Sequence, residues 1–177
     1  RVVAPVVPNA KKATSAQPTQ TPNKQPTPTP VPVWRAVEPN EAEALAWYRR
    51  AVELGDAPSA ARLGFAFERG QFGLEPNDAE AVRLYRIAAE AGDVDAALAL
   101  AHLLDEGSDV ERDEAAALEF FRTAAEAGNA AAACDLGARL AGYLEGFGGE
   151  KDEAEGLRWL RRSAELGFGT ASFILGS

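Results

Sequence analysis

Few residues in this sequence could take part in chemistry. His102 is the only histidine and Cys134 the only cysteine. A general base or a metal site at His102 would need polar partners, and its helix face offers none that we can identify. No second histidine is present to activate the Cys134 thiol as a nucleophile. We therefore predict that His102 is a half-buried spacer and Cys134 a small core residue.

Two further segments could suggest a ligand site, but both lack the residues that such a site needs. Residues 105–114 carry six acidic residues, without the order of carboxylates at loop positions 1, 3, 5 and 12 that binds calcium. Residues 146–149 are rich in glycine but lack the Lys-Ser/Thr of a phosphate-binding loop. No pair of carboxylates stands out for glycoside hydrolysis, because every predicted loop is acidic. We assign no catalytic, cofactor-binding or metal-binding residue and expect a protein that is not an enzyme.

The composition changes sharply at about Val33. Residues 1–33 hold 8 of the 11 prolines, four basic residues, and no acidic, aromatic or glycine residue. Such a Pro/Thr-rich segment buries too little apolar surface to fold, so we predict an extended basic tail over residues 1–33 and a folded domain over residues 34–177. The domain has a formal net charge of −13, which argues against nucleic acid as a partner.

The domain contains four copies of one unit. Residues 38–45, 75–82, 111–118 and 150–157 align without gaps, at spacings of 37, 36 and 39 residues, within the range of solenoid repeats. Each copy has an Asn or Asp at a helix N-cap position and, further on, a glycine that can end the helix. A second helix follows each glycine, which predicts four pairs of antiparallel helices. The caps are Asn40, Asn77, Asp113 and Asp152, and the glycines are Gly55, Gly92, Gly128 and Gly167.

The first helix of each pair carries two adjacent large residues. A small residue follows the first of them at i+4, so both lie on one face of the helix, and we expect this first large residue to fill the core. A leucine beside a small residue in the second helix predicts a close approach between helices. The pairs of large residues are Trp47-Tyr48, Leu84-Tyr85, Phe120-Phe121 and Trp159-Leu160.

These residues resemble the repeat pattern of the Sel-one-like family, which is related to the tetratricopeptide repeats. The matching stretches are Ser59-x-x-x-Leu63-Gly64-x-x-Phe67, Gly70-x-x-Gly73-Leu74-x-x-Asn77 and Ala88-Ala89-x-x-Gly92. The resemblance covers about residues 37–177 and implies a right-handed α-solenoid whose relatives usually act as adaptors in multiprotein complexes. Many bacterial relatives are exported or associated with membranes. Ala101 departs from the pattern where glycine is usual, and the lone Cys134 cannot form the disulfide that braces some secreted relatives.

We therefore expect an interaction scaffold for protein partners, with no small-molecule substrate. Among its locations we favour a bacterial membrane-associated or periplasmic complex, in which the tail or a segment before it would be the tether. The alternatives are a cytoplasmic regulatory adaptor or, less favoured, a cell-wall-directed hydrolase. The candidate contacts on the inner helices are Arg62, Phe65, Arg69, His102 and Arg139, and those in the extended loop are Tyr143 and Phe147. The competing interpretation is that these are ordinary solvated positions.

Overall fold

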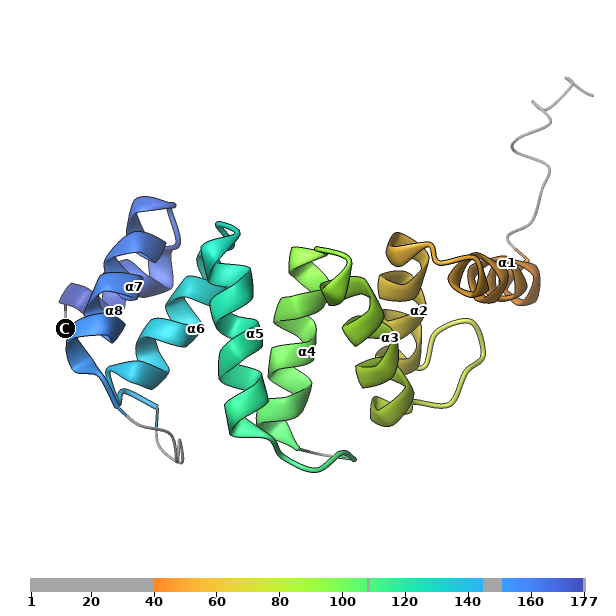
Figure 1. Ribbon diagram of the computed structural model, residues 1–177, viewed down its shortest axis with the longest axis horizontal. Helices are drawn as coiled ribbons and strands as arrows, with labels where there is room; N and C mark the ends of the chain where they lie inside the picture. Colours follow the sequence, from red (N-terminus) through yellow and green to blue (C-terminus); the bar gives the residue numbers. More distant parts are fainter. Residues whose placement is uncertain (1–39, 108, 145–150, 177) are drawn as a thin grey trace, which may run out of the picture. The chain divides into compact units, whose positions relative to one another are not determined.

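The structure is a computed structural model that describes residues 40–107, 109–144 and 151–176. All of these residues belong to one of the two units into which the chain divides, Glu38–Ser177. Over the described residues the chain forms eight helices and no strand, which confirms the predicted all-helical fold (Figure 1). The helices are α1 Glu41–Glu53, α2 Ala57–Arg69, α3 Asp78–Glu90, α4 Val94–Glu106, α5 Glu114–Glu126, α6 Ala130–Leu140, α7 Glu153–Glu165 and α8 Gly169–Gly176.

The helix boundaries follow from local sequence. Helices α1 to α7 each begin after an Asn or Asp side chain that accepts the backbone N–H three residues further on, as Asn40 does from Glu43 at 3.1 Å. This satisfies one of the four N–H groups that a helix N-terminus leaves unpaired. Gly92, which follows α3, has a φ of 93°, a conformation that glycine adopts without strain and other residues avoid. The predicted caps are therefore confirmed.

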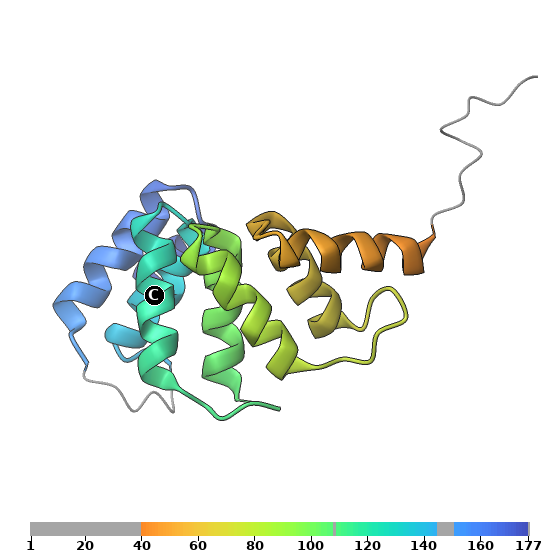
Figure 2. The same ribbon diagram turned by 45° about the vertical axis from the view of Figure 1, so that its right-hand side comes forward.

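The helices form two layers. Consecutive helices make the main contacts, and Figures 1 and 2 show them following one another from α1 to α8. Side chains also reach past one helix to the next member of the same layer. In the odd-numbered layer Arg122 of α5 pairs with Glu155 of α7 at 3.0 Å, and in the even-numbered layer His102 of α4 contacts Asp135 of α6 at 3.3 Å. The helix pairs therefore stack as a solenoid.

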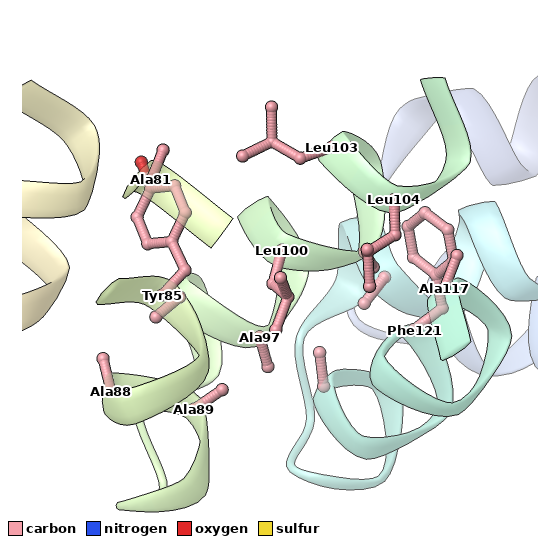
Figure 3. Close-up of a cluster of buried hydrophobic side chains, with 14 of the residues drawn as sticks. Ala81, Tyr85, Ala88, Ala89, Ala97, Leu100, Leu103, Leu104, Ala117 and Phe121 are labelled. Atoms are coloured by element: carbon pink, nitrogen blue, oxygen red, sulfur yellow. The ribbon is translucent and has the colours of Figure 1, made fainter. Parts of the chain in front are cut away.

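The core is filled by leucines and aromatic residues set among alanines. Figure 3 shows Leu100 and Leu104 of α4 between Tyr85 of α3 and Phe121 of α5. Tyr85 and Phe121, like Leu160 in α7, are the second residue of each pair of large residues, and all three are buried.

The expectation that the first residue of each pair fills the core is wrong for Trp47. Its side chain is 67% exposed, whereas Leu84, at the same position in α3, is fully buried. Phe120 and Trp159 are half-buried. Leu84 lies in α3, which packs against both α2 and α4, whereas among the described helices α1 packs mainly against α2 alone. Within the described residues α1 therefore has one neighbouring helix fewer than α3.

Helices α6 and α7 approach each other so closely at Gly137 that no side chain would fit there. A Cβ atom on Gly137 would lie 2.8 Å from both the Gly156 carbonyl oxygen and the Leu160 backbone nitrogen. Real Cβ atoms essentially never come this close to backbone. The predicted close approach at the leucine–glycine step is therefore present here, with glycine on both helices.

Candidate protein-binding groove

Helix α2 presents a row of three exposed side chains. Arg62, Phe65 and Arg69 stand at positions i, i+3 and i+7, so they lie on one face of the helix. Phe65 is 40% exposed, and the Arg69 guanidinium carbon lies 5.9 Å from its ring centroid. Arg69 also pairs with Glu68 at 3.0 Å. Among the described residues Arg62 has no ion-pair partner.

A groove separates this row from α4. It consists of two adjoining hollows of about 480 and 500 Å³, which share Phe65 from α2, Tyr85 from α3, and Asp95 and Ala99 from α4. We call it the α2–α4 groove. Its α4 wall carries exposed acids at both ends, Asp95 and Glu106. The apolar part of this wall is formed by Leu98, Ala99, Leu103 and the half-buried His102.

The base of the groove contains a neutral hydrogen-bond donor. Tyr85 is 3% exposed, and its hydroxyl donates to Glu68 Oε2 at 2.8 Å. Burial, together with the Glu68 carboxylate that accepts this bond, raises the pKa of the Tyr85 phenol, because both disfavour the phenolate. Tyr85 therefore holds Glu68 in place beside Arg69.

The corresponding gap between α4 and α6 is bridged by polar contacts. His102 Nε2 lies 3.3 Å from Asp135 Oδ2, and Arg139 lies 2.5 Å from Asp105 Oδ2. The Arg139 guanidinium carbon is also 4.1 Å from the Phe121 ring centroid. The Arg139 side chain is only 8% exposed, so it fills the space between these two helices where it pairs with Asp105.

The two gaps differ because a few equivalent residues differ. At the repeat spacing, His102 of α4 corresponds to Phe65 of α2, and Asp135 of α6 corresponds to Ala99 of α4. Phe65 and Ala99 have no polar side-chain atoms, so they cannot form the contact that joins His102 to Asp135. Similarly, Asp105 and Arg139 correspond to Glu68 and Leu103. Leu103 cannot pair with Glu68 in the way that Arg139 pairs with Asp105. Glu68 instead accepts a hydrogen bond from the Tyr85 hydroxyl and pairs with Arg69 of its own helix. Among the described residues no ion pair joins α2 to α4, and the gap stays open.

The structure separates the residues that the sequence grouped as candidate contacts. Arg62, Phe65 and Arg69 lie together on the groove, and His102 lies at its edge. Two corrections concern the inner face. His102 has a polar partner that the sequence did not identify, the Asp135 carboxylate, as well as the Phe121 ring. Arg139 is buried by Asp105 and Phe121 rather than open to a partner.

The two loop candidates do not extend this site. Tyr143 is 54% exposed but does not line the groove, and Phe147 lies outside the described residues. The groove residues missed by sequence reasoning include Asp95, Ala99 and Glu106. The repeat alignment carried a signal for them, since Ala99 stands where α2 has Arg62 and α6 has Asp135.

Of the two residues with a possible chemical role, Cys134 is buried in the packing of α6, whereas His102 is half-buried. Cys134 is 4% exposed, and burial raises the pKa of its thiol, which disfavours the reactive thiolate. This agrees with its predicted core role. The part of the chain that the structure describes contains no group of three or more potential metal ligands, and none of its helices is long and apolar enough to cross a membrane.

Stacked pairs of antiparallel helices in two layers define an α-solenoid of the tetratricopeptide-like class. Residues 35–56, 57–93, 94–129 and 130–168 each match the Sel1 repeat, so the chain belongs to the Sel1 repeat family. The resemblance identified from the sequence is thereby confirmed.

Solved structures show the same fold. A protective antigen of uropathogenic Escherichia coli that displays an SLR fold is 36% identical, with a TM-score of 0.68 over 75% of this chain and 27% of its own. A Sel1 repeat protein of Oxalobacter formigenes is 29% identical, with a TM-score of 0.63 over 73% of this chain and 51% of its own. Cysteine rich protein B of Helicobacter pylori, 18% identical with a TM-score of 0.56, shares the fold. This chain thus matches from a quarter to a half of the length of the first two proteins. Among curated protein sequences no significant match was found.

Proposed function

We propose that this protein is a non-catalytic scaffold that binds a protein partner through the α2–α4 groove. Sel1 repeat proteins are generally protein-interaction scaffolds. The observation that carries the proposal for this chain is the open groove itself, with exposed Phe65 between two hollows and charged side chains on both walls. Exposed aromatic and arginine side chains are the residue types most often found at binding hot spots.

The nature of the two chemically versatile residues favours a scaffold over an enzyme. Cys134 is buried with a raised thiol pKa, and His102 contacts Asp135 and the Phe121 ring, which is 5.1 Å away, centroid to centroid. His102 thus has an orienting carboxylate, but among the described residues it makes no hydrogen bond to a Ser, Cys or Thr that it could activate. These contacts suit a packing role. A cell-wall-directed hydrolase remains the less favoured alternative from the sequence.

We further propose that the scaffold is an accessory subunit of a bacterial membrane-associated or periplasmic complex, rather than a cytoplasmic regulatory adaptor. The basic Pro/Thr-rich segment 1–33 beside an acidic domain supports this location, since such a segment suits an anionic membrane or an acidic protein surface. Similarity to a protective antigen of a pathogenic bacterium is in keeping with it.

Site-specific photo-crosslinking in the native cells tests the groove. A photoreactive amino acid placed at Phe65 or at Ala99 should give one discrete adduct with a partner protein. The same amino acid at Arg158, an exposed position on α7, is the matched control and should not give that adduct. Equal adducts from all three positions, or none from the groove positions, would refute the groove as the binding surface.

The location is tested separately, by affinity purification in mild detergent with the intact chain and with a version lacking residues 1–33. Recovery of a membrane complex by the intact chain alone would support tethering through the tail. Recovery of the same soluble partner by both versions would instead favour the cytoplasmic adaptor.

A further inference from the structure

The α2–α4 groove has walls of opposite charge that do not neutralise each other. The α2 wall carries Arg62 and Arg69, of which Arg69 pairs with Glu68 on the same helix at 3.0 Å. The α4 wall carries Asp95 and Glu106 at its two ends, with the N-cap residue Asp93 close to Asp95. Among the described residues these groups form no ion pair across the groove. Asp95 accepts only a long hydrogen bond from Asn129, at 3.4 Å. Among the described residues Arg62, Asp95 and Glu106 have no ion-pair partner, and the Arg69 side chain, though paired with Glu68, is 62% exposed. These four charged groups face a ligand in the groove, with Phe65 and Ala99 between them.

The spacing of the arginines indicates the conformation of the ligand. Arg62 and Arg69 are seven residues apart on one helix, which places them about 10.5 Å apart along its axis. A ligand helix running along the groove has the same rise, so two of its residues seven positions apart would face both arginines. In an extended peptide the same distance is about three residues, which point alternately to opposite faces. The spacing therefore favours a helix over an extended peptide.

We propose that the occupant of the groove is an amphipathic helix of a partner protein with segregated charges. Its apolar stripe packs against Phe65 and Ala99. One flank of the stripe carries carboxylates seven residues apart, which pair with Arg62 and Arg69, and the other flank carries Lys or Arg side chains that face Asp95 and Glu106. This inference rests on the proposed function and names the chemistry of the partner.

Two synthetic helical peptides of the same composition, about 18 residues each, test the pattern of charges. In the segregated peptide two Glu lie seven residues apart on one flank of a leucine stripe, and two Lys lie on the other flank. In the mixed peptide each flank carries one Glu and one Lys. Exchanging the flanks would be no control, because a helix that reverses direction in the groove also exchanges its flanks.

Binding to the intact protein is measured by fluorescence anisotropy at low salt, and helix formation by circular dichroism. We expect the segregated peptide to bind about tenfold more tightly than the mixed peptide, because four favourable contacts become two favourable and two repulsive ones. The difference should shrink as salt is added. Equal affinities, no binding of either peptide, or binding without a gain in helix signal would overturn the inference.

Charge reversal in the protein gives a second readout. Arg62→Glu with Arg69→Glu should weaken binding of the segregated peptide about tenfold or more and strengthen that of a third peptide with Lys on both flanks. Arg158→Glu with Arg162→Glu makes the same change in net charge on α7 and should leave both affinities within about twofold. If both double variants weaken binding equally, only net charge matters and the inference fails.

The failure of this inference differs from that of the proposed function. If Phe65 cross-links to the native partner but both peptides bind equally, the scaffold proposal stands and the charge-segregated helix is wrong. If the groove positions give no cross-link in cells, the proposed function itself fails.

Discussion

At the scale of single residues, burial depends on which neighbouring helix covers a side chain. Trp47 and Phe121 are both large aromatics in the first helix of a repeat, yet Trp47 is 67% exposed and Phe121 fully buried. Phe121 lies within the main core and also supports His102 and Arg139 through its ring. The residue type alone therefore does not predict which of these positions is buried.

This difference gives a prediction for stability. Phe121→Ala should destabilise the fold by about 3–5 kcal/mol, because it leaves a cavity that the core cannot fill. Trp47→Ala should cost less than about 1 kcal/mol, because it removes mainly exposed surface. Urea unfolding of both variants beside the wild type checks this. A larger loss for Trp47→Ala than for Phe121→Ala would mean that another part of the protein covers Trp47.

Tyr85 gives a prediction for pH dependence. The pKa of its phenol is raised in the folded protein, so as pH rises the unfolded chain, whose tyrosine has a pKa of about 10, loses the proton first. The stabilising contribution of Tyr85 is therefore complete below pH 10 or so and is lost as pH rises above that value. Tyr85→Phe should cost about 1–2 kcal/mol at pH 8 through the lost hydrogen bond to Glu68, and this deficit should shrink toward pH 11.

Urea unfolding of the wild type and of Tyr85→Phe between pH 8 and 11 measures this effect. The comparison removes the contribution of lysines, which titrate in the same range in both proteins. A constant difference between the two curves would show that the Tyr85 phenol ionises as readily in the folded state as in the unfolded chain.

At the scale of helices, the sequence predicts most of what the structure contains. All seven N-caps were predictable, because an Asn or Asp before each helix acts on the backbone three residues away and needs no information about the fold. The pairing of helices followed from the repeats. Distances between helices were not predictable, because glycine at the leucine–glycine step permits close packing without specifying how close.

The α6–α7 contact makes this point testable. Gly137→Ala would stabilise an isolated helix by about 0.5–1 kcal/mol. In this protein it should instead destabilise by about 1–3 kcal/mol, because the new Cβ would meet the backbone of Gly156 and Leu160, which cannot move without separating the helices.

Gly64→Ala is the matched control on α2. Its Cβ would lie 3.0 Å from a ring carbon of the Tyr85 side chain, and not against backbone, so its cost should be smaller. Thermal unfolding of the two variants compares them directly. A higher melting temperature for Gly137→Ala would show that α6 and α7 are farther apart than described.

At the scale of the whole domain, function depends on where the repeats differ. The sequence indicated an inner face and named Arg62, Phe65, Arg69, His102 and Arg139 on it. Four of these five line the open groove, whereas Arg139 fills part of the next gap. A repeat pattern predicts that equivalent positions face the same way. It does not predict whether charged side chains at those positions form an ion pair across the gap between two helices, because that depends on the residues of both repeats.

The difference between the two gaps can be tested by placing the residues of the α4–α6 gap at the equivalent positions of the α2–α4 groove. The triple variant Phe65→His, Ala99→Asp and Leu103→Arg gives the α2–α4 groove the residues that bridge the gap between α4 and α6, with Glu68 already in place of Asp105. We expect the variant to fold, because Arg139 shows that the fold accepts a buried arginine at this position. The new polar side chains should occupy the groove, so cross-linking from Ala61, which lines it on the α2 side, should be lost. Loss of the cross-link with an unchanged circular dichroism spectrum would support the groove as the binding surface. Undiminished cross-linking by the folded variant would mean that the partner binds elsewhere and that the difference between the two gaps has no part in recognition.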